Sequence, residues 1–140
     1  MMTRSPVLLV VVAGSLLAAG EPEDDLAMYQ GVWVLVSEEF QGKQIPPDQL
    51  EELTCTVRND KILYRSNGKI QSAIIMLDPN KTPKSFSLLR EDGHLFMKGI
   101  YELKSERIKI CAEDDQGDRP KEFKTGAGSK NRIRVWKRLP

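Results

Sequence analysis

The sequence predicts an all-β protein, an antiparallel up-and-down barrel of about eight strands with short helical turns at its ends. Short β-rich runs recur at intervals of about ten residues from residue 54 onward, as in an antiparallel meander. Asn67-Gly68 and Asp92-Gly93 are predicted hairpin turns. A type I′ turn needs positive φ at both central residues, and this requirement favours Asn-Gly and Asp-Gly. No long helical pattern alternates with these runs, which argues against a parallel α/β sheet.

Residues 1–20 have the composition of a secretory signal peptide. Arg4 precedes an apolar run from Pro6 to Ala13, and small residues precede the acidic Glu21. The run is shorter than the stretch of about 20 apolar residues that spans a bilayer. We therefore expect an exported protein, periplasmic, in the cell envelope or extracellular, with no stable membrane insertion after cleavage. An uncleaved anchor or a buried N-terminal helix is the alternative.

The charge balance gives no reason to expect a nucleic-acid partner. The chain has 21 basic and 20 acidic residues, and removal of residues 1–20 with Arg4 makes the two counts equal. We expect a linker and a short helical turn over residues 21–30, capped by Asp24 or Asp25. Residues 31–140 then form one β-barrel domain, large enough to bury its own core.

Local signals define the remaining elements in chain order. The first strand is predicted over 32–40, and proline with early carboxylates predicts a helix of one or two turns over 45–53. Two prolines make 78–84 a rigid loop. An acidic loop at 113–119, an extended segment at 120–124 and a glycine-rich loop at 125–130 precede the last strand. The other strands are predicted at 54–59, 62–66, 69–77, 85–90, 94–103, 107–112 and 131–139.

The last strand combines high charge with an aromatic residue. Alternation places one set of side chains on one face, Arg132, Arg134, Trp136 and Arg138, and Ile133 and Val135 on the other. A stripe of arginines around an aromatic residue could stack on nucleic-acid bases, but the neutral charge balance disfavours this. We expect the arginine face to point outward, with Ile133 and Val135 filling the barrel.

Gly31-x-Trp33, after a short helical turn, resembles the first-strand signature of lipocalins. The wider pattern is similar to an uncharacterised lipocalin-like family expanded in planctomycete bacteria, and the matches span about residues 26 to 138. Two features depart from the family pattern: Tyr29 replaces an expected leucine, and the usual glycine-serine-glycine loop reads Gly126-Ala127-Gly128-Ser129. The matching motifs are Gln30 and Ser37 around the signature, Gly42-Lys43 with Ile45-Pro46, Asp78-Pro79 with Lys81 and Pro83-Lys84, Gly99-Ile100-Tyr101-Glu102, Leu103 with Ile108-Lys109-Ile110-Cys111, Arg119-Pro120 with Glu122-Phe123, and Lys137-Arg138.

The resemblance implies a closed barrel with a helical cap, and ligand binding only by analogy with better-known relatives. It also implies that Arg134 or Arg138 covers the indole of Trp33 in a cation–π contact, so that Gly31, Trp33 and one of these arginines close the barrel. The family supplies no established activity. Apolar and aromatic side chains of the kind that line such a lumen are Trp33, Leu35, Val57, Ile74, Met76, Leu88 and Tyr101.

We expect a non-catalytic domain that binds a small apolar molecule in the barrel. No cofactor is expected. The alternative is a structural or protein-interaction domain of the cell envelope with a filled barrel. An interior of eight strands is just wide enough for side chains or for one small ligand. An enzyme is disfavoured, because the single histidine, His94, follows a hairpin turn and has no evident serine partner. The adjacent Glu38 and Glu39 face opposite sides of a strand, unlike the paired carboxylates of a glycosidase.

No metal site is expected either. His94, Cys55 and Cys111 match no short-range zinc motif, and the acidic residues 113–118 lack the ligand spacing of a calcium-binding loop. An exported compartment would permit a disulfide between Cys55 and Cys111. Their strands argue against it, because Cys55 alternates with apolar residues and Cys111 with basic ones. Two separate buried or half-buried thiols are the favoured interpretation.

Overall fold

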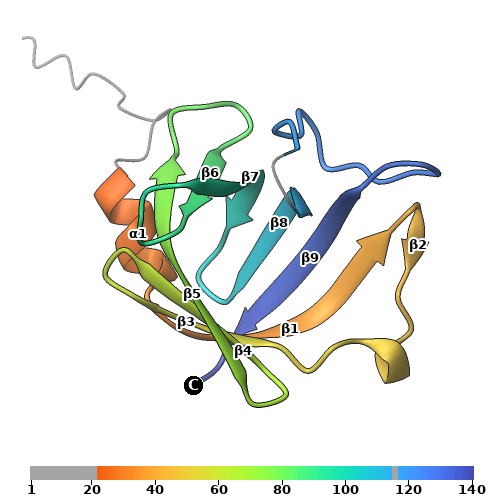
Figure 1. Ribbon diagram of the computed structural model, residues 1–140, viewed down its shortest axis with the longest axis horizontal. Helices are drawn as coiled ribbons and strands as arrows, with labels where there is room; N and C mark the ends of the chain where they lie inside the picture. Colours follow the sequence, from red (N-terminus) through yellow and green to blue (C-terminus); the bar gives the residue numbers. More distant parts are fainter. Residues whose placement is uncertain (1–21, 115–116) are drawn as a thin grey trace, which may run out of the picture.

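The computed structural model describes residues 22–114 and 117–140. The first helix covers one end of a sheet whose strands follow one another in chain order (Figure 1). In chain order the elements are α1 Pro22–Tyr29, β1 Gly31–Phe40, β2 Lys43–Gln44, the 3-10 turn η1 Pro47–Gln49, β3 Thr54–Arg58, β4 Lys61–Ser66, β5 Lys69–Asp78, β6 Ser85–Leu89, β7 Leu95–Leu103, β8 Arg107–Asp114 and β9 Asn131–Arg138.

Within the described residues, nine strands form one antiparallel sheet that closes on itself where β1 pairs with β9. Eight of these strands make the barrel, and β2 is a two-residue extra strand beside the end of β1. Every barrel strand pairs with its nearest barrel neighbour in the chain, as in an up-and-down barrel. The chain is an all-β, lipocalin-like barrel, and the predicted fold class is confirmed.

The predicted helix over 45–53 is wrong. Only Pro47–Gln49 forms a single 3-10 turn, and Leu50 after it is extended, with φ −70° and ψ 131°. Helix nucleation is unfavourable, so one turn needs apolar packing to extend it, and this turn has no buried residue. The predicted extended segment at 120–124 lies outside the strands of the sheet.

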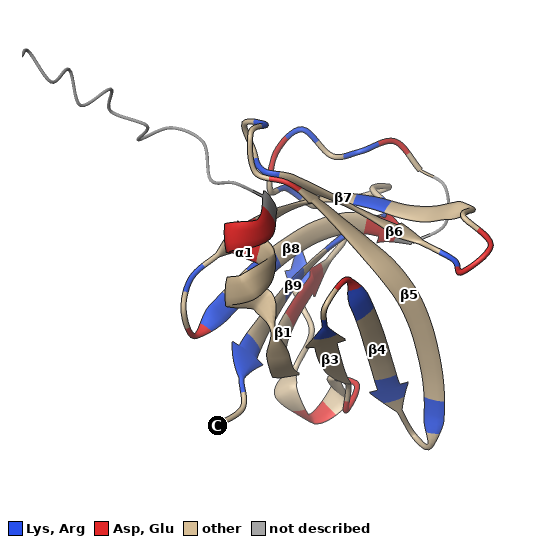
Figure 2. Cartoon of the chain, turned by 90° about the vertical axis from the view of Figure 1, so that its left-hand side faces the viewer, with Lys and Arg blue, Asp and Glu red and all other residues tan. Residues whose placement is uncertain are grey.

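The two ends of the barrel differ. In Figure 2, α1 and the turn of the β4–β5 hairpin lie on opposite sides of the barrel. We call the α1 side the closed end and the hairpin side the mouth. The closed end is filled by buried side chains that include Tyr29, Trp33, Leu35, Cys55, Val57, Ile62, Ala73, Ile75, Tyr101 and Ile108.

Trp33 and Arg138 join the first and last strands at the closed end, where they are paired across β1 and β9. The indole of Trp33 is fully buried, and its Nε1 donates to the carbonyl of Tyr29 at 3.0 Å. The guanidinium of Arg138 lies 4.3 Å from the centre of the Trp33 ring and donates to the carbonyls of Met28 and Gln30. The predicted cation–π contact is therefore made by Arg138 and not by Arg134.

Gly31 is required beside this contact. Its φ is +117°, and a Cβ at this position would lie 3.0 Å from Nη1 of Arg138. The glycine therefore lets the chain pass from α1 into β1 beneath the arginine. The structural closure predicted from Gly31, Trp33 and one arginine is confirmed.

A polar contact holds α1 against the barrel. The buried carboxylate of Asp25 accepts a hydrogen bond from the Tyr101 hydroxyl at 2.6 Å and lies 3.0 Å from Nζ of Lys84. Burial, and then the hydrogen bond to Asp25, raise the pKa of Tyr101 above its ordinary value, so the hydroxyl stays a donor at neutral pH. Asp25 therefore links α1 to β7 and to the loop before β6.

The segment 117–130 crosses the outer wall of the barrel, and we call it the strap. Arg119 donates to the carbonyls of Phe86 and Gly99 and, at 3.0 Å, to the hydroxyl of Ser87. Nζ of Lys109 lies 4.9 Å from the ring centre of Phe123. The strap is thus fixed to the outside of β6, β7 and β8.

The two cysteines are free, and both are buried. Cys55 is paired with Trp33 across β3 and β1 and faces the barrel interior, where burial raises its pKa to about 12. The Sγ of Cys111 lies 3.8 Å from the carbonyl of Glu122 in the strap, on the outer face of β8, and burial raises its pKa too. The barrel wall separates the two thiols, so the disulfide considered from the sequence is not formed.

Gly99 is fixed by a close approach inside the barrel. A Cβ there would lie 2.4 Å from the Phe86 ring and 2.7 Å from the carbonyl oxygen of Cys111. We expect Gly99→Ala to lower the free energy of unfolding by about 1–3 kcal/mol through overpacking, measured by urea denaturation. Gly126→Ala is the matched control, because nothing lies within 4 Å of its Cβ position. Equal losses in the two variants would contradict the close-approach explanation.

A candidate ligand-binding cavity at the barrel mouth

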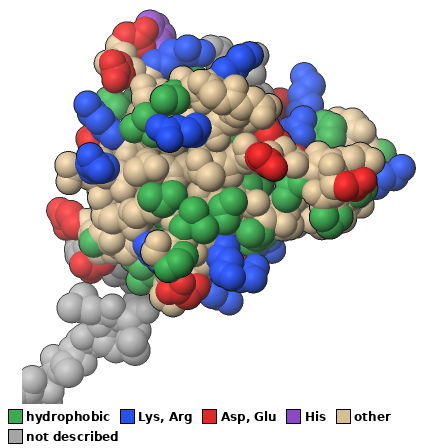
Figure 3. Space-filling model, turned by 90° about the horizontal axis from the view of Figure 1, so that it is seen from below, with side chains coloured by type: hydrophobic (Ala, Val, Ile, Leu, Met, Phe, Trp, Pro, Cys, Tyr) green, Lys and Arg blue, Asp and Glu red, His purple; other side chains and the backbone are tan. Residues whose placement is uncertain are grey.

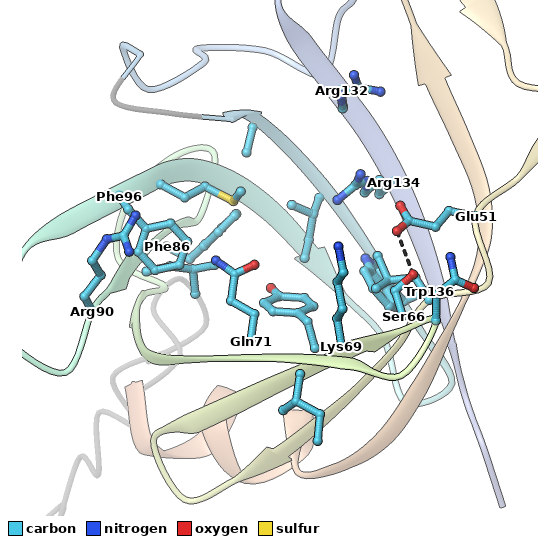
Figure 4. A pocket seen from close by; sticks show the side chains of 18 residues that line it. Glu51, Ser66, Lys69, Gln71, Phe86, Arg90, Phe96, Arg132, Arg134 and Trp136 are labelled. Carbon is cyan, nitrogen blue, oxygen red and sulfur yellow. Dashed lines mark hydrogen bonds between the residues drawn. The ribbon is translucent and has the colours of Figure 1, made fainter.

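The mouth half of the barrel holds a half-open cavity of about 790 Å³. This volume falls in the range of about 300–1,000 Å³ found for small-molecule sites. Figure 4 shows the lining side chains projecting into the cavity from strands on several sides. Its apolar and aromatic lining, apart from the exposed Ile70, we call the floor: Leu53, Tyr64, Phe86, Leu88, Phe96, Met97, Ile110, Ala112 and Trp136.

Two arginines of β9 also line the cavity, Arg132 and Arg134. Trp136 on the same face of β9 is buried and is paired with Leu35 of β1 and Ile108 of β8, both inside the barrel. The expected orientation of the last strand is therefore wrong, because the arginine face points inward while Ile133 and Val135 face outward. Alternation identifies two faces of a strand but not which of them is inside.

A β-bulge in β1 explains how the arginines are accommodated. The register with β9 shifts between Leu35 and Ser37, so that Glu38 is paired with Arg134 and faces the interior. Without the bulge, Glu38 would lie on the opposite face from Leu35. Before the bulge, β1 therefore contributes apolar side chains to the core. After the bulge, it contributes the buried carboxylate of Glu38.

Glu38 compensates both arginines. Nε of Arg134 donates to Oε1 of Glu38 at 2.6 Å, and Nη1 of Arg132 lies 3.5 Å from the same oxygen. The Glu38 side chain is only 9% exposed, so these contacts supply the counter-charge that a buried carboxylate needs. The Arg132 guanidinium also stacks on the Phe40 ring, with 4.1 Å between Cζ and the ring centre. Together, the side chains of Glu38, Phe40, Arg132 and Arg134 form one wall of the mouth.

Lys69 and Arg90 line the cavity from β5 and from the end of β6. Arg90 stacks on Phe96, with its Cζ 5.4 Å from the ring centre. Within the described chain, neither Lys69 nor Arg90 forms an ion pair. Glu51, the carboxylate in the lining, accepts a hydrogen bond from the hydroxyl of Ser66 at 2.8 Å. The cavity thus combines an apolar floor with a predominantly basic rim.

The residues predicted to line the lumen divide into three groups. Leu88 lines the cavity. Ile74 and Met76 do not line it, and the Met76 side chain is 58% exposed on the outer face of β5. The other four fill the closed end instead of a ligand space: Trp33, Leu35, Val57 and Tyr101.

The error on β5 has a simple physical cause. Ala73 and Ile75 are the buried residues of this strand, and a shift of one residue exchanges the two faces. Alanine is a weak hydrophobic signal, whereas Ile74 and Met76 are strong ones. The sequence signal that identifies the inner face is the polar Lys69 and Gln71, which lie on the same face as Ala73 and line the cavity.

The other candidate chemical groups lie apart from the cavity. His94 is 80% exposed, and its Nδ1 lies 3.0 Å from Oδ1 of Asp92, whose pKa is lowered by hydrogen bonds from His94. Glu39 faces the outside and accepts a hydrogen bond from the Thr125 hydroxyl at 2.8 Å, so Glu38 and Glu39 do point in opposite directions. Among the described residues, no group of three or more His, Cys, Asp or Glu side chains could hold a metal ion. Part of the acidic run 113–118 that was considered for calcium, residues 115 and 116, lies outside the described residues.

Comparisons with known proteins found no matching family model, no matching curated protein and no matching solved structure. In the part of the chain that the structure describes, no helix combines the length and the apolar character needed to cross a membrane. The predicted signal peptide, residues 1–20, lies outside the described residues.

Proposed function

We propose that this protein is an exported, non-catalytic member of the lipocalin-like family that binds a small, partly apolar molecule at the barrel mouth. The observation that carries the proposal is the half-open cavity of about 790 Å³ with its apolar and aromatic floor. Export rests on the composition of residues 1–20, and family membership rests on Gly31-x-Trp33 and the closed barrel.

The division of the barrel supports a preformed site. The closed end is tightly filled, so the strands that continue to the mouth are held in place without a ligand. Tyr64 and Trp136 meet in the floor with 6.0 Å between their ring centres, and both side chains line the cavity. Aromatic rings offer large contact areas at a low cost in conformational entropy, which suits binding of an apolar ligand part.

The alternative is a structural or protein-interaction domain of the cell envelope. A filled barrel describes only the closed end. The face in Figure 3 presents hydrophobic side chains in a short central band and in smaller groups near charged ones, whereas an interaction surface would need a contiguous apolar patch of several hundred Å². The exposed large hydrophobic residues in the described chain are Met28, Val32, Val36, Ile70, Met76, Leu95 and Leu139.

Filling the cavity tests the proposal. We expect Ala112→Phe to weaken binding of dodecanol at least about tenfold, because the new ring occupies the floor. Binding is measured by isothermal titration calorimetry below the micellar concentration, and a thermal melt verifies folding. Ala127→Phe, in an exposed loop away from the cavity, is the matched control. Gln71→Trp fills the same cavity from β5 and replaces an exposed residue, so it serves if Ala112→Phe is unstable.

Unchanged dodecanol binding in both cavity variants would place the ligand elsewhere and contradict the proposal. Native mass spectrometry of the protein purified from its own source adds an independent measurement. We expect a small molecule to travel with the chain, and the same spectrum gives the chain mass. A mass that includes residues 1–20 would contradict export through a cleaved signal peptide.

A further inference from the structure

We infer that the ligand is an amphiphile with an anionic head group, which lies among the basic side chains of the rim while its apolar chain lies on the floor. This inference rests on the proposed function and specifies its ligand class. It was not expected from the sequence, which predicted an apolar lumen and an apolar ligand.

The charges in and behind the cavity lining are unequal. Four cations line the cavity, Lys69, Arg90, Arg132 and Arg134, and the carboxylates of Glu51 and Glu38 oppose them. Among the side chains that the structure describes, the lining and the wall behind it therefore hold four cations and two carboxylates, an excess of two positive charges. The whole chain has a formal net charge of only +1, so this excess is local and does not follow from composition.

The excess is not needed to stabilise the wall. Glu38 already pairs with Arg132 and Arg134, and Arg90 stacks on Phe96. In contrast, Lys69 forms no ion pair or hydrogen bond with the described part of the chain. In Figure 4 its side chain extends from β5 into the cavity toward the wall formed by β9.

A cleft with low-dielectric walls and one dominant sign of charge focuses its field and concentrates ions of opposite sign. An anion at the rim meets the ammonium of Lys69 in that field. The floor lies below this position and includes Phe86, Leu88 and Met97, which offer no charge to a ligand. A ligand that satisfies both regions has an anionic end and an apolar chain, as in a fatty acid or an alkyl phosphate.

Three probes with the same alkyl chain test the inference: dodecanoate, dodecyl phosphate and dodecanol, titrated below their micellar concentrations. We expect the anions to bind about tenfold more tightly than dodecanol at low salt. This advantage should shrink as salt is added, because salt screens exposed charges. The stronger of the two anions identifies a carboxylate or a phosphate as the preferred head group.

The variant Lys69→Gln tests whether Lys69 is the residue that contacts the anionic head group. We expect it to weaken dodecanoate binding about threefold to fivefold and to leave dodecanol binding unchanged. Lys61→Gln is the matched control, because Lys61 is an exposed lysine at the first residue of β4, at the opposite end of the β4–β5 hairpin from Lys69, and does not line the cavity. It should change neither affinity.

The outcomes separate the two proposals. If dodecanol binds as tightly as both anions, the anionic head group is excluded while binding in the barrel stands. If Lys69→Gln and Lys61→Gln behave alike, the placement of the head group at Lys69 is overturned. If none of the three probes binds, both the inference and the proposed function are overturned.

Discussion

Trp33→Ala should lower the free energy of unfolding by about 3–5 kcal/mol, the usual cost of removing a fully buried large aromatic side chain. The indole is fully buried and packs on Tyr29, with 5.4 Å between ring centres. Alanine leaves a cavity at the point where β1 meets β9. It also removes the ring that the Arg138 guanidinium covers and the donor to the Tyr29 carbonyl.

Urea denaturation of the variant and of the parent protein measures this loss. Val32→Ala is the matched control, because Val32 precedes Trp33 on the same strand and is 39% exposed on the other face. We expect its effect to lie within about 0.5 kcal/mol of the parent. A Trp33→Ala protein that melts at the parent temperature would show that the closed end does not hold the barrel together.

Glu38→Gln should have two opposite effects, a less stable fold and tighter binding of an anion. The neutral amide leaves Arg132 and Arg134 without their shared carboxylate, and breaking a buried ion pair costs about 3–5 kcal/mol. We expect about 2 kcal/mol, because the arginine side chains are 31% and 22% exposed and water compensates part of their charge. The same change adds one positive charge to the rim, so dodecanoate affinity should rise about threefold.

Thermal or urea unfolding and calorimetric titration of the same preparation measure the two effects. Glu39→Gln is the control, because Glu39 is the neighbouring carboxylate on the outer face and its bond to Thr125 can be kept by an amide oxygen. If Glu38→Gln weakens dodecanoate binding, the charge of the rim does not attract the head group. A stability equal to that of Glu39→Gln would mean that the Glu38 contacts contribute nothing to the wall.

The sequence predicts those parts of this fold that depend on short-range signals. The Asn67-Gly68 turn has φ of 50° and 76° at its two residues, as a hairpin of this type requires. The strand order follows from such hairpins, because consecutive antiparallel strands with short connections pair with their neighbours. Gly31 and Trp33 are predictable in the same way, because the Gly-x-Trp signature lies within three residues of chain.

The candidate cavity was not predictable in the same way, because it depends on which face of each strand is inside. Ile133 and Val135 look like core residues and Arg134 looks like a surface residue, yet their positions are exchanged. The exchange is stable only because the bulge in β1 brings Glu38 to Arg134 from a strand 96 residues away. A contact of this kind leaves no local pattern, so neither the inward arginines nor the basic rim could be inferred from alternation.

The bulge at Val36 has a practical consequence for protein engineering. On β1, Trp33 lies before the bulge and Glu38 after it, so one strand serves the core on one side and the cavity on the other. Positions such as Lys69, Gln71 and Arg90 can therefore be randomised in a library while the closed end is kept unchanged. The barrel then serves as a scaffold whose selectivity evolves independently of its folding.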